Sequence, residues 1–166
     1  SSTKTIIKAL QKSSEFELFS IVGGAATLPK FGEIDKLMVQ DGLPKPSHVF
    51  NMFIDGSTTA SMSQSCALGL GHITNIFESV RPDAVIVVGD RFDILPPAIA
   101  ASLMNITLVH TMGGEVTGTI DESIRHAVTK LANIHFVANE DARKRVVKMG
   151  EDASNVHNVG CPRMDL

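Results

Sequence analysis

The sequence predicts an α/β fold, with a doubly wound, mainly parallel sheet that carries helices on both faces. Two observations support this fold class, and a third bears on the number of domains. Short apolar runs alternate with helix-length segments along the chain, which is the pattern of a parallel sheet. The run AVIVV at 84–88 has no polar alternation, as expected of a strand covered on both faces. The length of 166 residues, without a repeat or an obvious linker, indicates a single domain spanning 1–166.

The first half of the chain is expected to contain three helices and two extended segments. Ile6, Ile7 and Leu10 have helical spacing, and the apolar run FELFSIV is followed by Gly23-Gly24, which fits a strand. Ser57 is a residue type that caps helices, and the Arg-Pro-Asp sequence at 81–83 ends the helix that follows it. The expected segments are helix 3–12, strand 16–22, helix 32–40, extended segment 49–54 and helix 57–79.

The second half alternates strand and helix more regularly. Pro96-Pro97 fits the first turn of a helix that runs to Met104. The expected strands are 84–88, 106–109, 134–137 and 156–159, and the other expected helices are 119–131 and 139–149. Folds of this kind normally open with a strand and a glycine-rich loop, whereas this chain opens with a helix. We therefore expect that the chain is a fragment and that its first strand precedes Ser1.

Composition argues against several classes of protein. The formal net charge is −3 and there is no basic run, so nothing predicts nucleic-acid binding. No apolar run approaches the ~20 residues of a membrane span, and the N-terminus lacks the pattern of a secretory signal. Cys66 and Cys161 lie far apart and outside any metal-binding spacing. We expect no metal site, and reduced thiols in the cytoplasm.

Polar residues follow each strand of the second half, at the point where the strand ends. The segments are Gly89-Asp90-Arg91, then 112–115, Asn139-Glu140 and 160–162. Because parallel strands end at one edge of the sheet, these segments are expected to line one crevice, which is where open α/β sheets bind ligands. Asp90 and Glu115 lie on neighbouring turns of that edge, close enough to face one substrate.

Each of these residues also has a structural interpretation. Asp90 can satisfy the N–H groups of its own turn, and Glu115 can be a solvated acid of a surface loop. Gly113 and Gly114 can supply a tight turn with positive φ. Alternatively, they can let a ligand approach the backbone, where exposed N–H groups bind an anion.

The helix 119–131 concentrates ionisable groups at the same edge. Thr119 and Glu122 have the spacing of a capping box, and Asp121 lies in the first turn, where the helix dipole favours an acid. Arg125 and His126 are i,i+4 partners of Asp121 and Glu122. The apolar stripe that should face the sheet is Ile120, Ile124, Ala127, Val128 and Leu131. Such a gathering of titratable side chains at a crevice favours a functional site. Among the isolated histidines, His110 at a strand end is the best candidate.

Three stretches resemble the UDP-N-acetylglucosamine 2-epimerase family: GDRFD at 89–93, GGEVTGTIDESIRHAVTKLANIHFVAN at 113–139 and VGCPRMD at 159–165. The resemblance is greatest to the hydrolysing branch, which makes N-acetylmannosamine for sialic-acid-type sugars. It implies the N-terminal of two domains in a glycosyltransferase-B-like fold. It also implies a UDP-sugar substrate, no cofactor, and a homo-oligomer as the full-length enzyme.

The family resemblance further implies a chemistry and its residues. A base removes the proton from sugar C2, UDP leaves from C1, and water adds to the glycal-like intermediate with inverted configuration at C2. Asp90 and Asp121 would serve as acid and base, and Arg125 would orient them. Many relatives carry an acid or a His where Met112 stands, and Met cannot transfer a proton, so either Glu115 covers that role or the substrate differs. The residues implied to contact or position the sugar are Arg91, Gly113, Gly114, Glu122 and His126.

Other functions remain open on sequence grounds. The chain can belong to a non-hydrolysing epimerase, or it can be a sugar-nucleotide-binding fragment without catalytic competence. A phosphoacceptor domain with Asp90 as the acceptor is a weaker alternative, because such a domain needs an acidic pair after its first strand.

Overall fold

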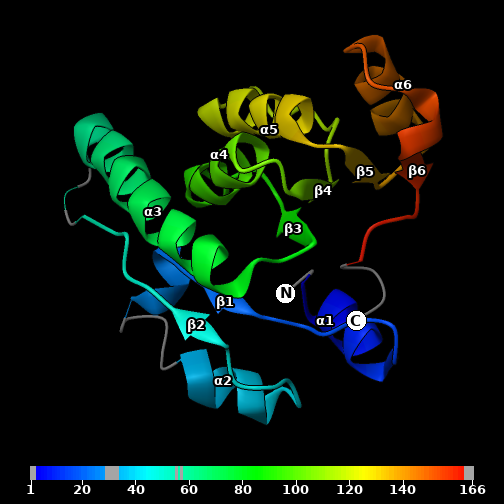
Figure 1. Ribbon diagram of the computed structural model, residues 1–166. Helices are drawn as coiled ribbons and strands as arrows, with labels where there is room; N and C mark the ends of the chain where they lie inside the picture. The colour runs from blue at the N-terminus through cyan, green and yellow to red at the C-terminus, as the bar shows by residue number, and fades with distance from the viewer. Residues whose placement is uncertain (1–2, 29–33, 55, 57, 163–166) are drawn as a thin grey trace.

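The computed structural model describes residues 3–28, 34–54, 56 and 58–162. It confirms the α/β fold, with parallel sheets and helices on both sides (Figure 1). A two-stranded parallel sheet pairs β1 (Ile21–Val22) with β2 (His48–Val49). A four-stranded parallel sheet has the order β3, β4, β5, β6. Its strands are Ala84–Val88, Thr107–Thr111, Ile134–Val137 and Val156–Asn158.

The helices cover the larger sheet unequally. Their bounds are α1 Thr3–Lys12, α2 Ile34–Gln40, α3 Thr59–Val80, α4 Leu95–Leu103, α5 Ile120–Leu131 and α6 Glu140–Lys148. Short 3-10 turns lie at η1 Gly24–Thr27, η3 Phe92–Ile94 and η4 Ala153–Asn155. In Figure 1, α3, α4 and α5 lie on one side of the larger sheet and α1 on the other. No helix within the described ranges has the length and apolar character that crossing a membrane would need.

The predicted elements agree with the structure apart from a few boundaries. Strand 16–22 shortens to Ile21–Val22, because only these two residues pair with β2 and the preceding Phe16 and Phe19 are exposed. The long helix is capped by Thr58: its hydroxyl accepts from the Ser61 N–H at 3.0 Å, and the Ser61 hydroxyl accepts from the Thr58 N–H at 3.2 Å. The predicted cap Ser57 lies outside the described residues, and so does the predicted helix start at Gly32.

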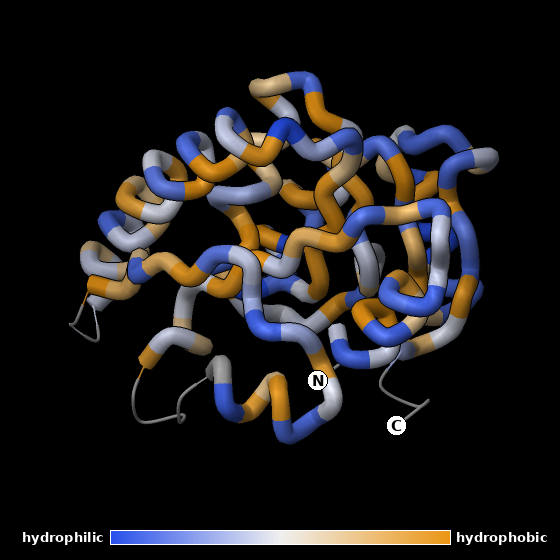
Figure 2. The backbone as a smooth tube through the Cα atoms, turned by 60° about the horizontal axis from the view of Figure 1, so that its bottom comes forward, coloured by the Kyte–Doolittle hydropathy of each residue, from blue (hydrophilic) through white to orange (hydrophobic). Residues whose placement is uncertain are grey.

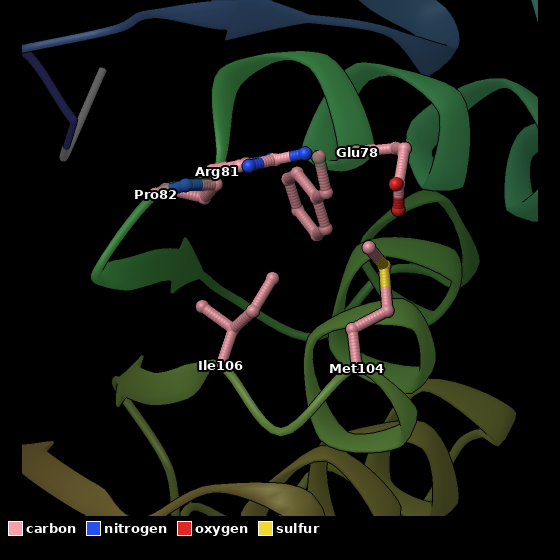
Figure 3. Close-up of a pocket in the computed structure, with 6 residues that line it drawn as sticks. Glu78, Arg81, Pro82, Met104 and Ile106 are labelled. Atoms are coloured by element: carbon pink, nitrogen blue, oxygen red, sulfur yellow. The ribbon is translucent and has the colours of Figure 1, made fainter.

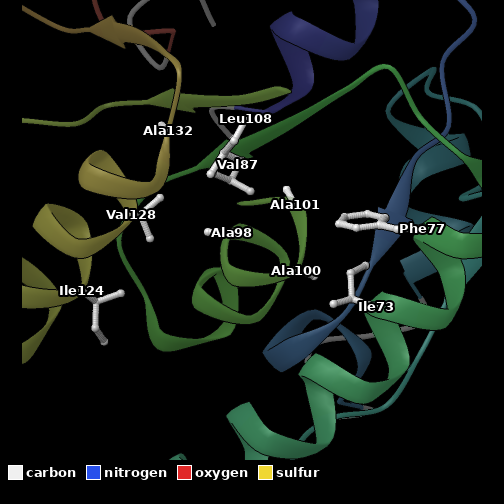
Figure 4. Packing of buried hydrophobic residues seen from close by; sticks show 10 residues of the cluster. All are labelled: Ile73, Phe77, Val87, Ala98, Ala100, Ala101, Leu108, Ile124, Val128 and Ala132. Atoms are coloured by element: carbon white, nitrogen blue, oxygen red, sulfur yellow. The ribbon is translucent and has the colours of Figure 1, made fainter. Parts of the chain in front are cut away.

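The core lies between the larger sheet and the three helices on its side. Apolar segments gather in the middle of the molecule (Figure 2). Phe77 of α3, Leu108 of β4 and Val128 of α5 meet there across α4, which contributes only alanines to the centre of the cluster (Figure 4). Small side chains let α4 lie close to both neighbouring helices and the sheet. Its buried alanines are Ala98, Ala100 and Ala101.

Strand register brings the carboxyl ends of the strands together. Val88 is the register partner of Thr111, and Thr111 is the partner of Phe136 on the next strand. The chain leaves β3 at Gly89, which has φ +94°, and leaves β4 at Met112, which has φ +65°. The loops that carry the predicted site residues therefore begin side by side at one edge of the sheet.

Candidate active site

A carboxylate held by a buried guanidinium is the centre of the site. Asp90 follows Gly89 directly after β3, and its side chain is 30% exposed. Nη2 of Arg125, on α5, donates to Oδ2 of Asp90. The Arg125 side chain is only 2% exposed, so the cation lies inside the protein while its partner stays accessible to a ligand.

Arg125 also joins the two loops that the sequence places next to each other. Its Nη1 donates to the Glu115 backbone carbonyl at 2.7 Å. One guanidinium thereby fixes the Asp90 side chain and the Glu115 backbone together, which is the forked geometry that Arg supplies and Lys does not. The prediction that these turns are neighbours is confirmed by this shared partner.

The buried face of α5 is rotated about the helix axis relative to the predicted apolar stripe, by about one residue position. Ile120 is 60% exposed and Ala127 is exposed, whereas Arg125 and Thr129 are buried beside Ile124 and Val128. The predicted apolar stripe, which leaves Arg125 out of the buried face of α5, is therefore wrong in part. The predicted i,i+4 pair of Arg125 with Asp121 is also wrong, since Arg125 binds Asp90. The spacing of apolar residues gave the wrong buried face of α5, because the Arg125 guanidinium is buried and its hydrogen-bond partners lie in other loops.

Glu122 orders the loop ahead of α5 rather than completing a capping box. Thr119 is the N-cap but makes no side-chain cap bond. The Glu122 carboxylate instead accepts from the backbone N–H groups of Gly118 at 2.6 Å and Thr117 at 2.7 Å. These two bonds, Gly118 first, lower the pKa of Glu122. The predicted i,i+4 contact with His126 is present, with Nε2 at 3.7 Å from Oε1.

The two glycines after β4 are required by close packing. A side chain at Gly113 would place Cβ 3.0 Å from both His110 Nδ1 and Thr129 Oγ1. At Gly114, φ is +78° and a Cβ would lie 2.5 Å from the Ala142 carbonyl oxygen of α6. The turn has positive φ as predicted, although at Gly114 and Met112 rather than at Gly113.

Arg91 and Asp121 reach the same edge from different elements. The Arg91 side chain is mostly exposed, and its Nε lies 3.8 Å from Oδ2 of Asp93. Asp93 in turn accepts from the Ala25 N–H at 3.4 Å, which ties the loop after β1 to this edge. Asp121 lies in the first turn of α5, as predicted, and is half-buried.

A hollow opens beside the Glu115 loop. Its volume is about 370 Å³. It is lined by Glu115, Val116, Asn139, Asp141, Ala142 and Arg145. Arg145 donates to the Gly114 carbonyl, so the same loop is fixed from α6 as well. The charged lining and its place at the carboxyl ends of the strands fit a polar ligand.

A second hollow lies at the opposite edge of the sheet. It measures about 190 Å³, and Phe77, Met104 and Ile106 form its apolar wall with Glu78 and Arg81 at the side (Figure 3). Arg81 precedes β3 and Ile106 precedes β4, so this hollow is at the amino ends of the strands. None of the predicted site residues lines it.

His110 is buried directly beneath the site. Its Nε2 lies 3.0 Å from the Gly89 carbonyl oxygen, and its Nδ1 lies 3.1 Å from Thr129 Oγ1. Burial is the largest cause of the lowering of its pKa to about 4, so the ring is neutral at pH 7. Thr129 and Arg145 were not among the predicted residues. The signal for Thr129 was its i,i+4 spacing from Arg125, which places both on one face of α5.

Comparison with known proteins identifies one family. The family model described as UDP-N-acetylglucosamine 2-epimerase matches residues 8–166. A UDP-N,N'-diacetylbacillosamine 2-epimerase (hydrolyzing) from Legionella pneumophila is 34% identical over 162 residues, which are 98% of this chain and 43% of that protein. A UDP-N-acetylglucosamine 2-epimerase from Neisseria meningitidis is 31% identical over 163 residues, covering 98% of this chain and 42% of that protein.

Solved structures agree in fold. The crystal structure of UDP-GlcNAc 2-epimerase from Neisseria meningitidis bound to UDP-GlcNAc matches 99% of this chain and 44% of that chain, with a TM-score of 0.84 and 18% sequence identity. At this identity the likeness establishes the fold. The chain spans about two-fifths of the length of the curated relatives it matches.

Proposed function

This chain belongs to the UDP-N-acetylglucosamine 2-epimerase family, and we propose that it forms the N-terminal, sugar-binding and catalytic half of a hydrolysing 2-epimerase. The reaction converts UDP-N-acetylglucosamine and water into N-acetylmannosamine and UDP. The two relatives described above, one of them named as hydrolyzing, support the reaction type. The match to glycosyltransferase-B-like neighbours supports the domain assignment.

The observation that carries the proposal is the accessible Asp90 carboxylate on the buried Arg125 guanidinium. Removal of a proton from sugar C2 needs a general base placed against the sugar and held in one orientation, and a carboxylate can serve as that base. Arg125 supplies that orientation and connects Asp90 to the Glu115 loop. A charged hollow beside Glu115 gives the sugar nucleotide a place to bind at the same edge.

The proposed steps balance as an elimination followed by hydration. A carboxylate takes the C2 proton, the C2–H electrons form a C1–C2 double bond, and the C1–O bond breaks so that UDP leaves with its electron pair. Water then adds a hydroxyl at C1 while an acid returns a proton to the other face of C2. Asp90 and Asp121 are the proposed acid and base, with Glu115 in the place of the proton-transferring residue that Met112 cannot be.

The remaining predicted residues are proposed to support the sugar in two ways. Arg91 and His126 are proposed to contact it directly. Gly113, Gly114 and Glu122 are proposed to act chiefly by shaping the loops, because each already has close neighbours within the protein. Both cysteines of the chain are free, which fits the proposed cytoplasmic location.

A non-hydrolysing epimerase is the second candidate function, since other relatives are named simply UDP-N-acetylglucosamine 2-epimerase. The two reactions differ in their products. A hydrolysing enzyme releases UDP and a free sugar, whereas a non-hydrolysing one returns a UDP-sugar with inverted C2.

The test is a product assay on the natural polypeptide that contains this sequence, whose length is first measured by mass spectrometry. UDP-N-acetylglucosamine and UDP-N,N'-diacetylbacillosamine are offered separately, and free UDP and the sugar epimer are quantified. We expect UDP release with one of them and a loss of kcat of about 100-fold or more in Asp90→Asn, since a general acid–base residue contributes about that much. An epimerised UDP-sugar without UDP release would favour the non-hydrolysing reaction. Binding without turnover would favour a binding module, and full activity in Asp90→Asn would reject the role of Asp90.

A further inference from the structure

The Gly89 carbonyl oxygen needs a hydrogen-bond donor that the sheet does not supply. Gly89 lies just beyond the last register pair of β3 and β4, Val88 with Thr111, and its φ of +94° turns the backbone out of the strand. Gly89 is partly buried, and a carbonyl shielded from water without a donor costs free energy, up to that of a lost hydrogen bond when burial is complete. His110 Nε2, at 3.0 Å, is the donor.

That contact fixes the tautomer of the ring. A carbonyl oxygen can only accept, so the neutral His110 ring must carry its proton on Nε2. Nδ1 is then an acceptor, and the Thr129 hydroxyl, 3.1 Å away, donates its one proton to it. The Arg125 backbone carbonyl, 3.0 Å from the same hydroxyl, is the alternative acceptor of that proton and does not receive it in this tautomer. The ring is thus held from α5 on one side and holds the end of β3 on the other.

These contacts form a closed circuit around Asp90. The circuit runs from Gly89 through His110 to Thr129 by hydrogen bonds, from Thr129 one turn back along the backbone of α5 to Arg125, and from the Arg125 guanidinium to Asp90, the residue after Gly89. Gly113 leaves room for it, because a side chain there would press on both His110 and Thr129. Two residues of α5 therefore fix Asp90, one through its side chain and one through the backbone beside it.

We infer that His110 is a positioning residue of the catalytic site, which sets the direction of the Asp90 carboxylate through the Gly89 carbonyl. The inference rests on the proposed function of Asp90 at the sugar. His110 does not touch the substrate in this arrangement, since it is fully buried. The Arg125–Asp90 contact alone would leave the turn after β3 free to rotate. The contact of His110 with the Gly89 carbonyl removes that freedom.

Two substitutions separate the two ends of the ring. The Gln amide nitrogen reaches about as far as Nε2, so His110→Gln keeps a donor for the Gly89 carbonyl and loses the Thr129 contact. The Asn amide reaches about as far as Nδ1, so His110→Asn keeps the Thr129 contact and loses the donor. Both place one uncharged amide in the same buried site, and each removes one hydrogen bond. Their costs in stability should therefore be similar.

The experiment measures kcat and KM per folded molecule for these variants of the natural polypeptide, with His72→Asn on the exposed face of α3 as the control. We expect His110→Asn to lower kcat by about 10- to 100-fold with little change in KM, because misplacing a reacting group by about 1 Å has that effect. His110→Gln should retain about tenfold more of kcat than His110→Asn. Equal kcat in both variants would reduce His110 to a core residue and overturn the inference.

Nuclear magnetic resonance tests the geometry without relying on turnover. In the unsubstituted protein, the His110 ring should show the Nε2–H tautomer at neutral pH, and the Nδ1–H tautomer would overturn the inference. The Gly89 and Asp90 amide signals should move more in His110→Asn than in His110→Gln.

If neither histidine variant folds, Thr129→Val should lower kcat and Thr129→Ser should restore it. An unsubstituted protein that does not turn over UDP-sugars, yet shows this tautomer and these shifts, would reject the proposed function alone.

Discussion

At the scale of single residues, buried polar side chains organise the proposed site more than exposed ones do. Arg125 and His110 are both fully or almost fully buried, yet each bonds to a loop at the edge of the sheet. Buried polar groups are costly unless every donor and acceptor is satisfied. Because their partners lie in the turns after β3 and β4, satisfying them also fixes those turns.

His110 predicts a measurable dependence of stability on pH. Its pKa is about 4 in the folded chain, lowered by burial first and then by His135 and Arg125, while the Gly89 contact and Asp90 raise it. The unfolded chain binds a proton near the ordinary value of 6.5, so below that pH protonation favours unfolding. The stabilisation is complete above pH 6.5 and is lost as the pH falls toward 4, with a total of about 3 kcal/mol.

Urea denaturation at pH 7.5 and at pH 5 checks this prediction. His110→Gln should show a smaller loss of unfolding free energy between the two pH values than the unsubstituted chain. It should still show some loss, because burial also lowers the pKa of His135, the register partner of His110 on β5. Equal losses in the two proteins would contradict the prediction.

At the scale of elements, helices α5 and α6 fix the Glu115 loop from two sides. Glu122 of α5 accepts from the Thr117 and Gly118 N–H groups, and Arg145 of α6 donates to the Gly114 carbonyl. The loop is therefore placed by the first turn of one helix and the body of another. Its own sequence supplies only the glycines that allow the close approach.

Gly114→Ala is expected to displace this loop from α6. The new Cβ would meet the Ala142 carbonyl oxygen at 2.5 Å, and backbone atoms cannot move aside as a flexible side chain can. Gly118→Ala is the matched control, because φ is also positive there, +71°, but nothing lies within 4 Å. The control should lose about 1–2 kcal/mol of unfolding free energy from backbone strain alone, and Gly114→Ala clearly more. Equal losses would show that the loop can shift away from α6 freely.

At the scale of the whole molecule, a core on one side of the larger sheet supports the site on its edge. Helices α3, α4 and α5 share one cluster of buried residues with β3 and β4 (Figure 4). The strands whose ends carry Asp90 and Glu115 are thus held by the same core as the helix that carries Arg125. Loosening that core should disturb both the fold and the relative placement of these groups.

Phe77→Ala tests how far the molecule unfolds as a unit. Phe77 of α3 is 2% exposed and packs in the shared cluster, so its loss should cost about 3–5 kcal/mol. Phe16→Ala, at a residue that is 60% exposed, is the control and should change stability by less than about 0.5 kcal/mol. Circular dichroism and an Asp90-loop amide signal should report the same transition in each protein. Separate transitions would show that the sheet edge unfolds independently of α3.

Local sequence patterns were enough to predict the order of helices and strands in the second half of the chain, and the edge of the sheet at which the polar loops lie. Local periodicity and turn residues encode such features, and strands 84–88 and 134–137 were predicted with the bounds observed. Only the folded chain shows which face of α5 is buried, which partners Arg125 and Glu122 bind, and that His110 binds the Gly89 carbonyl. Those contacts join residues from 10 to 35 positions apart, except for the local Glu122 bonds. Spacing along one element carries no information about a partner supplied by another.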